Sequence, residues 1–367
     1  MMAENTPGNA AQPADRILEW YGEGRLQADL HTVQDFWQGQ GRYIVSVYAS
    51  SQSYRQIFDL HLARRKAIRH HQVQARLPGI NIPAVFADWG TISTAKYWGG
   101  RVQFDSTGGN IFINPAAQTV EQALALQPLP VDHPEMDAFI GLEFYRRLTQ
   151  ELHTSAMWLR TPDMQGPLNT AGLVLNQEAL FVGMYEQPAR VHAFLEKVTA
   201  FLIEYARYLR DGSGGRICGN LWPYTFFPQE LGVSFTEDLM PLLSPRLYQE
   251  FGVPQLKRLA QALGGLHIHC CGDWGRHVPA LKTARLPIRA MEYHHPHTRI
   301  EELAPLAEDG VVFVPYILLH KQDKYGFISQ YYRWLLENTP YSYRYWFAFA
   351  DDTPEALAFA AEFGSHG

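Results

Sequence analysis

The sequence is poor in cysteine and has no long apolar run. It contains three cysteines, Cys218, Cys270 and Cys271, in 367 residues. Adjacent cysteines rarely bridge each other and an odd number leaves one over, which argues against a disulfide framework and predicts a reducing compartment, the cytoplasm. No apolar stretch reaches the ~18 residues that a membrane span needs. No charged segment followed by an apolar one opens the chain as in a signal peptide.

The chain also has no excess of basic residues. Its 31 lysines and arginines against 37 acidic residues give a net charge of −6 and a pI near 6.2. Without a basic footprint, nucleic acid is not an expected partner. Neither a GxGxxG nor a P-loop motif occurs, so no motif indicates nucleotide binding. The expected partner is a small-molecule substrate.

The chain shows no sign of a division into several domains. Residues 1–14 are small and polar, and we expect them to form a flexible N-terminal tail. No low-complexity linker or internal repeat interrupts residues 15–367, which predicts one domain.

Apolar strand-like segments and helical patterns alternate along the chain. The segments that read as strands are 43–49, 82–87, 155–160, 216–222, 266–271, 288–293, 311–317 and 344–350. Helical patterns fall at 186–210, where the 3.6-residue period is clearest, and near 278–284, 299–308, 326–338 and 353–363. Eight strands with helices between them predict an α/β fold, a (β/α)8 TIM barrel. A doubly wound open sheet is the alternative.

One segment interrupts this alternation. Residues 101–115 carry two short apolar stretches around Gly108-Gly109, which predicts a small hairpin insertion.

The most informative segment is the strand at 266–271, which runs into a glycine turn. Strand side chains alternate between faces, so His267, His269 and Cys271 share one face and Cys270 lies on the other. Two imidazoles and a thiol on one face are possible ligands of a metal such as zinc. The competing interpretation is a buried strand whose histidines are satisfied by hydrogen bonds.

Other polar and aromatic residues follow predicted strands, at the barrel end that carries active sites. Asp88 and Trp89 follow the second strand, and Glu237 and Asp238 lie in the loop after the fourth. Each of these carboxylates can equally be a helix cap or turn residue. Glu292 and His294 share a face of the sixth strand, with His295 and His297 beyond it. Trp222 and Tyr224 lie in an aromatic loop that suits a flat or apolar ligand.

Four segments together resemble the uroporphyrinogen decarboxylase superfamily, which includes corrinoid-dependent methyltransferases. The segments lie in the family's order within residues 43–363, and they are Val85-Phe86-Ala87-Asp88, Gly166-Pro167-Leu168 through Glu178, Leu243 to Phe251 (LSPRLYQEF), and His269-Cys270-Cys271-Gly272-Asp273. The resemblance implies a (β/α)8 barrel, in agreement with the strand count.

The resemblance does not favour the decarboxylase branch. The stretch from Val47 to Arg55 stands where decarboxylases have MRQAGRY, but it lacks the first arginine and the glycine. The decarboxylase's late histidine would fall near Phe347 and its substrate-facing tyrosine near Leu173. Asp88 alone matches.

The methyltransferase branch, by resemblance, binds zinc with an H-x-C motif and a distal cysteine. His269 and Cys271 match the motif, but the distal cysteine would again fall near Phe347, and no cysteine follows Cys271. Replacements for the third ligand are His267 on the same strand or, from neighbouring segments, Glu292, His294 or Glu237.

The resemblance therefore implies a zinc-dependent methyltransferase that transfers a methyl group to or from a thiol or a corrinoid on a partner protein. Asp88 and Glu237 are the expected catalytic carboxylates, and Trp89, Trp222, Tyr224 and His294 the expected substrate contacts. A second class is a decarboxylase or lyase acting on a small carboxylate or a porphyrinogen-like substrate, with Arg276 or Arg101 facing the pocket. A third class of function is a non-catalytic ligand-binding barrel. Measuring the metal content of the protein would distinguish it from the zinc-dependent methyltransferase.

Overall fold

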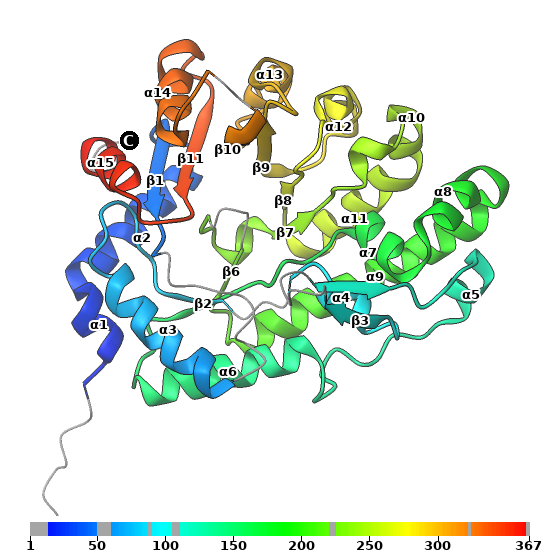
Figure 1. Cartoon of the computed structure of the whole chain (residues 1–367), viewed down its shortest axis with the longest axis horizontal. Coiled ribbons are helices and arrows are strands. Elements are labelled where there is room, and N and C mark those ends of the chain that lie inside the picture. The colour runs from blue at the N-terminus through cyan, green and yellow to red at the C-terminus, as the bar shows by residue number, and fades with distance from the viewer. Residues whose placement is uncertain are drawn as a thin grey trace, which may run out of the picture.

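Short parallel strands form the inner wall of the molecule, and helices cover it from outside (Figure 1). The structure is a computed structural model and describes residues 14–49, 60–86, 90–104, 111–219, 225–321 and 324–364. The strands are β1 (Tyr43–Val47), β2 (Ala84–Phe86), β3 (Arg101–Phe104), β4 (Ile111–Asn114), β5 (Trp158–Arg160), β6 (Ile217–Cys218), β7 (Val233–Thr236), β8 (Leu266–His269), β9 (Ile288–His295), β10 (Val312–Ile317) and β11 (Arg344–Phe349).

The helices lie before the first strand, between the strands and after the last one. They are α1 (Arg16–Tyr21), α2 (Glu23–Trp37), α3 (Leu60–Gln74), α4 (Ser93–Lys96), α5 (Val120–Ala125), α6 (Asp137–Glu151), α7 (Pro167–Val174), α8 (Gln177–Glu186), α9 (Pro188–Gly212), α10 (Pro245–Leu247), α11 (Val253–Leu263), α12 (Val278–Ala284), α13 (Ala304–Ala307), α14 (Ile328–Asn338) and α15 (Pro354–Phe363). Among the described residues, no helix has the length and apolar character needed to cross a membrane.

The strand order is that of an α/β barrel. Six strands pair in parallel in the order β1-β11-β10-β9-β8-β7, and β2-β5-β6 form a second parallel sheet. A parallel bridge between Gln165, just after β5, and Thr236 of β7 links the two sheets. The predicted fold class, a TIM-type barrel with a hairpin insertion, is confirmed. The hairpin is the antiparallel pair β3–β4, and its predicted turn at Gly108-Gly109 lies outside the described residues.

Alternation along the strands separates two apolar cores. In β11, Tyr345, Phe347 and Phe349 face the helices and belong to the large core between strands and helices. Trp346 and Ala348 belong to a smaller core inside the barrel. Because successive strand residues point to opposite faces, strands β1, β2, β6, β9, β10 and β11 contribute to both cores.

Helix α2 closes the amino end of the barrel. The rings of Phe36 and Trp37 lie 6.0 and 5.9 Å from the Trp346 ring, and Trp37 Nε1 donates to the Phe226 carbonyl oxygen. Arg344, the first residue of β11, donates to the Phe36 carbonyl oxygen and so holds the end of α2 at this face. The interior is filled from this side, which leaves the carboxyl ends of the strands for chemistry.

Two helices show why the sequence patterns were informative. Helix α9 buries a stripe that includes Val191, Leu195 and Leu202 and begins at Pro188, close to the predicted 186–210. Ser244 caps α10 through a 3.3 Å hydrogen bond from Leu247 N. Between Ser244 and Gly264 the chain forms α10, a π-helical turn at Tyr248–Gly252, and α11.

Candidate metal centre

Parallel strands β8 and β9 bring three polar side chains together at their carboxyl ends. Strand β8 ends at His269, and its register pairs Ile268 with Met291. The next residues, His269 and Glu292, therefore share the inner face of the barrel, and His294 lies two residues further along that face. The ligand atoms of His269, Glu292 and His294 all lie within 4.8 Å of one another.

Glu292 is fully buried and joins the two histidines. Its Oε2 accepts a hydrogen bond from His269 Nδ1, and its Oε1 accepts one from His294 Nε2 at 2.8 Å. A carboxylate oxygen is the acceptor in each of these hydrogen bonds, so the two ring nitrogens are the donors. The His294 ring also contacts the Tyr316 ring, with centroids 4.9 Å apart.

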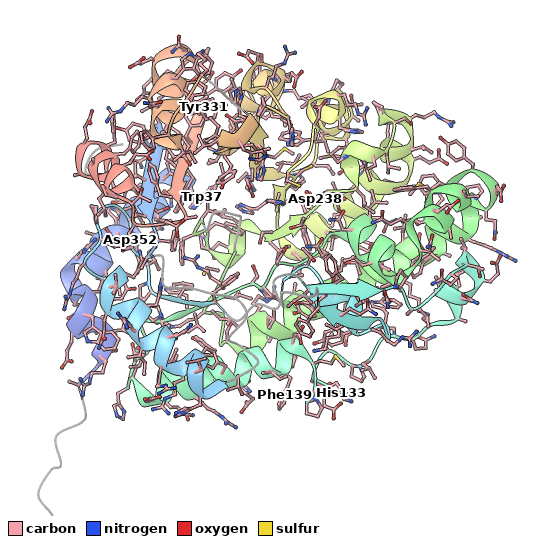
Figure 2. The ribbon with its side chains drawn as sticks, in the orientation of Figure 1. Trp37, His133, Phe139, Asp238, Tyr331 and Asp352 are labelled. Carbon is pink, nitrogen blue, oxygen red and sulfur yellow. The ribbon has the colours of Figure 1, made fainter. Side chains whose placement is uncertain are left out.

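A second group forms on the other side of the His269 ring. Asp238, just after β7, has Oδ1 3.8 Å from His269 Nε2 and accepts a 2.9 Å hydrogen bond from Cys271 N. The ligand atoms of Asp238, His269 and Cys271 again lie within 4.8 Å of one another. Cys271 is exposed, and the Asp238 side chain is 33% exposed. Figure 2 labels Asp238 beside β7 and β8, on the concave side of the strand arc. We call these five residues, Asp238, His269, Cys271, Glu292 and His294, the His269 cluster.

Two carboxylates, Asp238 and Glu292, flank the His269 ring and raise its pKa. Burial alone would lower the pKa of His269, but Glu292, Cys271 and Asp238 together raise it well above its ordinary value. Among the described residues, the ion-pair partners of Asp238 and Glu292 are histidines, and no lysine or arginine forms an ion pair with either. Nitrogen, sulfur and oxygen donors in a site of negative charge fit zinc.

A further carboxylate, Asp163, lies beside the His269 cluster. Its Oδ1 accepts hydrogen bonds from Thr236 Oγ1 at 2.7 Å and from Gln165 Nε2 at 2.9 Å. Burial raises the pKa of Asp163, and the nearby carboxylates Asp238 and Glu292 raise it further, whereas Thr236 and His269 lower it. The sequence pattern did not identify this residue.

His267 does not join the His269 cluster. It shares the inner face of β8 with His269 but lies two residues deeper, about 7 Å along the strand. Its ring stacks on Phe227 with centroids 3.2 Å apart, and its Nε2 lies 3.3 Å from the Leu231 carbonyl oxygen. Burial lowers the pKa of His267 well below its ordinary value, so the ring is a neutral part of the barrel interior.

Glu237 lies on the opposite side of the chain from Asp238. Phe235 faces the helices, and Glu237, two residues on, does so too: its carboxyl packs against Gly166 at the start of α7. Burial, and then Asp238, raise the pKa of Glu237 to about 8, so the group is neutral at pH 7. The structure thus brings Asp238, and not the predicted Glu237, to the His269 cluster.

Four predicted site residues, Asp88, Trp89, Trp222 and Tyr224, lie outside the described residues. Their proposed parts in catalysis and substrate contact stay predictions. Phe347, near which the distal cysteine of the family would fall, is buried against Tyr332 and Phe359 on the helix side of β11.

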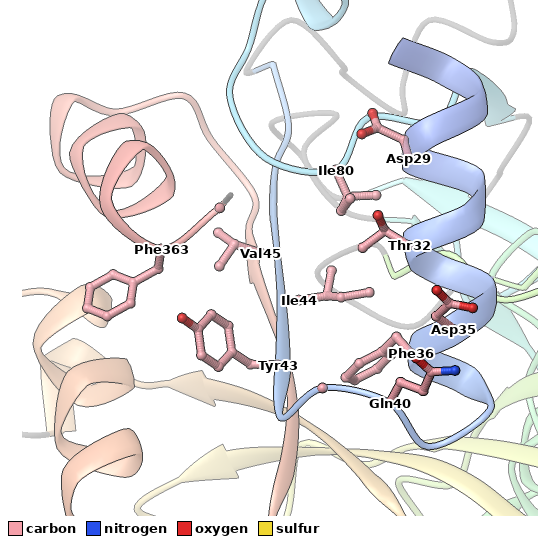
Figure 3. Close-up of a pocket in the computed structure, with 12 residues that line it drawn as sticks. Asp29, Thr32, Asp35, Phe36, Gln40, Tyr43, Ile44, Val45, Ile80 and Phe363 are labelled. Carbon is pink, nitrogen blue, oxygen red and sulfur yellow. The ribbon is translucent and has the colours of Figure 1, made fainter. Parts of the chain in front are cut away.

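A separate pocket lies at the amino end of the barrel. It has a volume of about 400 Å³ between α2, the start of β1 and the end of α15, and its lining includes Asp29, Thr32 and Tyr43 (Figure 3). Asp29 Oδ2 accepts a hydrogen bond from Asn81 N, and its pKa is raised by burial to about 6. This face of a barrel serves stability, so we assign the chemistry to the opposite end.

Comparison with known proteins agrees with the geometry of the fold. A solved structure described as a methyltransferase from Methanosarcina mazei matches with a TM-score of 0.63 and 12% sequence identity, covering 91% of this chain and 96% of that chain. No curated protein sequence matches. The family model described as uroporphyrinogen decarboxylase (URO-D) matches residues 36–219, a segment that includes Asp88 and ends before β7. Because this match spans half of the chain, the protein belongs to the uroporphyrinogen decarboxylase family.

Proposed function

We propose that this protein is a zinc-dependent methyltransferase. The observation that supports it is the convergence of Asp238, His269 and Cys271 at the carboxyl ends of the strands, with ligand atoms within 4.8 Å of one another. A thiolate, an imidazole and a carboxylate suit zinc, and three protein ligands leave a position for substrate. The similarity of the fold to a methyltransferase structure is consistent with this reaction.

In this proposal His269 and Cys271 hold the metal, with a third ligand from a neighbouring carboxylate. Bound zinc supplies a positive charge that keeps a substrate thiol ionised at neutral pH, or that polarises a methyl donor. Cys271 is exposed, so a substrate can approach the site from solvent. Asp88 orients the substrate or moves a proton, and Trp89, Trp222, Tyr224 and His294 contact it.

The methyl group passes to or from a thiol or a corrinoid carried by a partner protein. The test uses methylcobalamin as donor and a small thiol as acceptor, and follows loss of the methylcobalamin spectrum with the purified, zinc-loaded protein. Elemental analysis of protein purified without chelator is expected to give about one zinc per chain, lost in Cys271→Ala and retained in Cys270→Ala. Cys270 is the matched control because it is buried in the core on the helix side. Equal zinc content in all three proteins would contradict the proposal.

A decarboxylase or lyase acting on a small carboxylate is the second candidate. Arg160, the last residue of β5, is 4% exposed and donates a 2.6 Å hydrogen bond to Tyr48 Oη. A buried guanidinium at the carboxyl end of a barrel strand suits a carboxylate substrate. The arginines expected for this role lie elsewhere: Arg276 donates to the Pro241 and Leu243 carbonyl oxygens, and Arg101 is exposed on the hairpin. Release of carbon dioxide with no methyl transfer would favour this candidate.

A further inference from the structure

The pocket at the amino end of the barrel contains a carboxylate whose charge is only partly met. The side chain of Asp29 is 13% exposed, and its Oδ2 accepts a 3.0 Å hydrogen bond from Asn81 N. Arg25 Nε lies 3.9 Å from the same oxygen, but the guanidinium donates its hydrogen bonds to backbone carbonyl oxygens of residues 75–79. Within the described part of the chain, Asp29 Oδ1 accepts no hydrogen bond.

The electrostatic surroundings of Asp29 favour a positive charge in this pocket. Burial raises the pKa of Asp29 to about 6, and the opposing effects of Asn81 N and Arg25 do not offset it. Among the described residues that line the pocket, none is a lysine, an arginine or a histidine. The other carboxylate of the lining, Asp35, pairs with His31 on the exposed side of α2 at 3.4 Å. A cation that enters the pocket therefore meets carboxylates and no competing cation of the lining.

Buried hydrogen bonds fix the position of the Asp29 carboxylate. Asn81, which donates to it, is itself buried, and its Oδ1 accepts a hydrogen bond from Gln74 Nε2. Gln74 is also buried and bonds the backbone at the end of β1, where Nε2 donates to the Val47 carbonyl oxygen at 2.7 Å and Oε1 accepts from Ala49 N at 2.8 Å. The carboxylate is thus held in place before a ligand binds, which reduces the entropy lost on binding.

The remaining walls of the pocket suit an apolar stem. Ile44 and Ile80 are buried and line the pocket beside α2, and the rings of Tyr43 and Phe363 line it on the other side of β1 (Figure 3). The volume of about 400 Å³ lies near the lower end of the ~300–1,000 Å³ found for small-molecule sites. A fixed carboxylate beside aliphatic and aromatic walls matches a small amine with an alkyl chain.

We propose that this pocket binds a small organic cation, a protonated amine with a short alkyl stem, and that Asp29 is its anchor. The ammonium group donates to Asp29 Oδ1, and the stem packs against Ile44 and Ile80. The pocket and the His269 cluster lie at opposite ends of the barrel, so the bound amine does not contact the reacting atoms. The proposal does not depend on the zinc site.

Calorimetric titration at neutral pH with pentylamine, 1-pentanol and pentanoate tests the requirement for charge, because the three probes share one stem. The parent protein is expected to bind pentylamine about 10-fold or more tightly than 1-pentanol, the effect of a hydrogen bond between charged groups. It is not expected to bind pentanoate. Asp29→Asn keeps an acceptor for Asn81 N but removes the charge, so this variant is expected to bind pentylamine no more tightly than 1-pentanol.

Glu23→Gln is the matched control, because Glu23 is an exposed carboxylate in the first turn of the same helix and does not line the pocket. Its affinity for pentylamine is expected to equal that of the parent protein, and circular dichroism verifies that both variants are folded. Equal affinities of the parent protein for pentylamine and 1-pentanol would overturn the proposal, as would unchanged binding of pentylamine by Asp29→Asn. Failure of the parent protein to bind pentylamine would overturn it as well.

Discussion

At the scale of single residues, the barrel separates charged groups by the face on which they lie. Glu237 and Asp238 are neighbours in sequence, yet one packs against α7 and the other lies beside His269. The same alternation separates Cys270, buried toward the helices, from Cys271, which is exposed. Adjacent residues of one type therefore have different chemistry here, and substitutions should be designed in such pairs.

Asp88 is the residue through which we expect protons to move. Asp88→Asn keeps the shape of the side chain but removes the ionisable group, so we expect the fold and bound zinc to be retained and most methyl transfer to be lost. If Asp88 is instead a structural cap, the variant loses roughly 1 kcal/mol of stability and turns over normally. Melting temperature, zinc content and turnover measured on one preparation distinguish the two.

His71 makes the stability of the protein sensitive to acid. It is 2% exposed, and its Nδ1 forms a 3.0 Å hydrogen bond with Tyr21 Oη. Burial, with a smaller effect of Arg160, lowers the pKa of His71 from 6.5 to about 3. Between these values the unfolded chain binds more protons than the folded one. Titration of His71 therefore leaves the unfolding free energy unchanged above pH 6.5. Below that pH it lowers the unfolding free energy, by up to ~1.4 kcal/mol per pH unit.

His71→Gln tests this pH dependence, since the amide oxygen can still accept from Tyr21 but does not titrate. We expect the loss of unfolding free energy between pH 6 and 4, measured by urea denaturation, to be less steep in the variant by about 1 kcal/mol per pH unit. His70 and His277, whose pKa values burial also lowers, titrate in both proteins and serve as the common background. Equal slopes in the two proteins would remove His71 as a source of acid sensitivity.

At the scale of elements, a contact between two glycines fixes how β7 begins beside β8. Gly232 has φ +113°, and a Cβ there would overlap the backbone of Gly265, the residue before β8. Gly310 also has a positive φ, +77°, but no atom lies within 4 Å of its Cβ position. Comparing alanine substitutions at Gly232 and Gly310 therefore separates the free-energy cost of the backbone conformation from the cost of the overlap.

We expect Gly310→Ala to cost about 1 kcal/mol of unfolding free energy, from the left-handed conformation alone. Gly232→Ala is expected to cost about 1–3 kcal/mol more, because backbone must move to admit the methyl group. It should also weaken metal binding, since β7 carries Asp238. Chemical denaturation of both variants measures the difference, and equal costs would show that the overlap is relieved without strain.

Elements with a clear period could be predicted from the sequence. Helix α9 has a long apolar stripe, and the wall strands β9, β10 and β11 are apolar runs near their predicted positions. Strand β7 was not among the predicted strands. It has only four residues and follows an aromatic loop, and no helical pattern separates it from β6. Helices α1 and α2 precede the first strand of the alternation, so the alternation of strands and helices does not indicate them, although Asp15 caps α1.

Within the candidate site, only the residues that lie on one strand could be predicted from the sequence. His269 and Cys271 stand two residues apart, so their shared face follows from the strand period alone. Asp238 and Asp163 reach the same place from other strands, and their proximity depends on which strands are neighbours. Recognition of β7 would have found Asp238, since Phe235 faces outward and residues 234, 236 and 238 then face inward.

At the scale of the whole molecule, family membership does not fix the reaction. The region from Val47 to Arg55 lacks the first arginine of the decarboxylase motif, which by the resemblance binds the carboxylates of the substrate. We therefore expect no turnover of uroporphyrinogen. Formation of coproporphyrinogen at a rate typical of enzymes, on the order of 1 per second or more, would show that the protein is a decarboxylase of the family's usual kind.

The closure of the barrel by α2 determines from which end ligands can reach the His269 cluster. Phe36, Trp37 and Trp346 fill the amino end, so molecules reach the His269 cluster from the carboxyl end of the strands. A methyl donor and a methyl acceptor then share one entrance. If one of them is as bulky as a corrinoid, the smaller one must bind first, and an excess of the bulky one is expected to slow the reaction by blocking the entrance before the smaller one has bound.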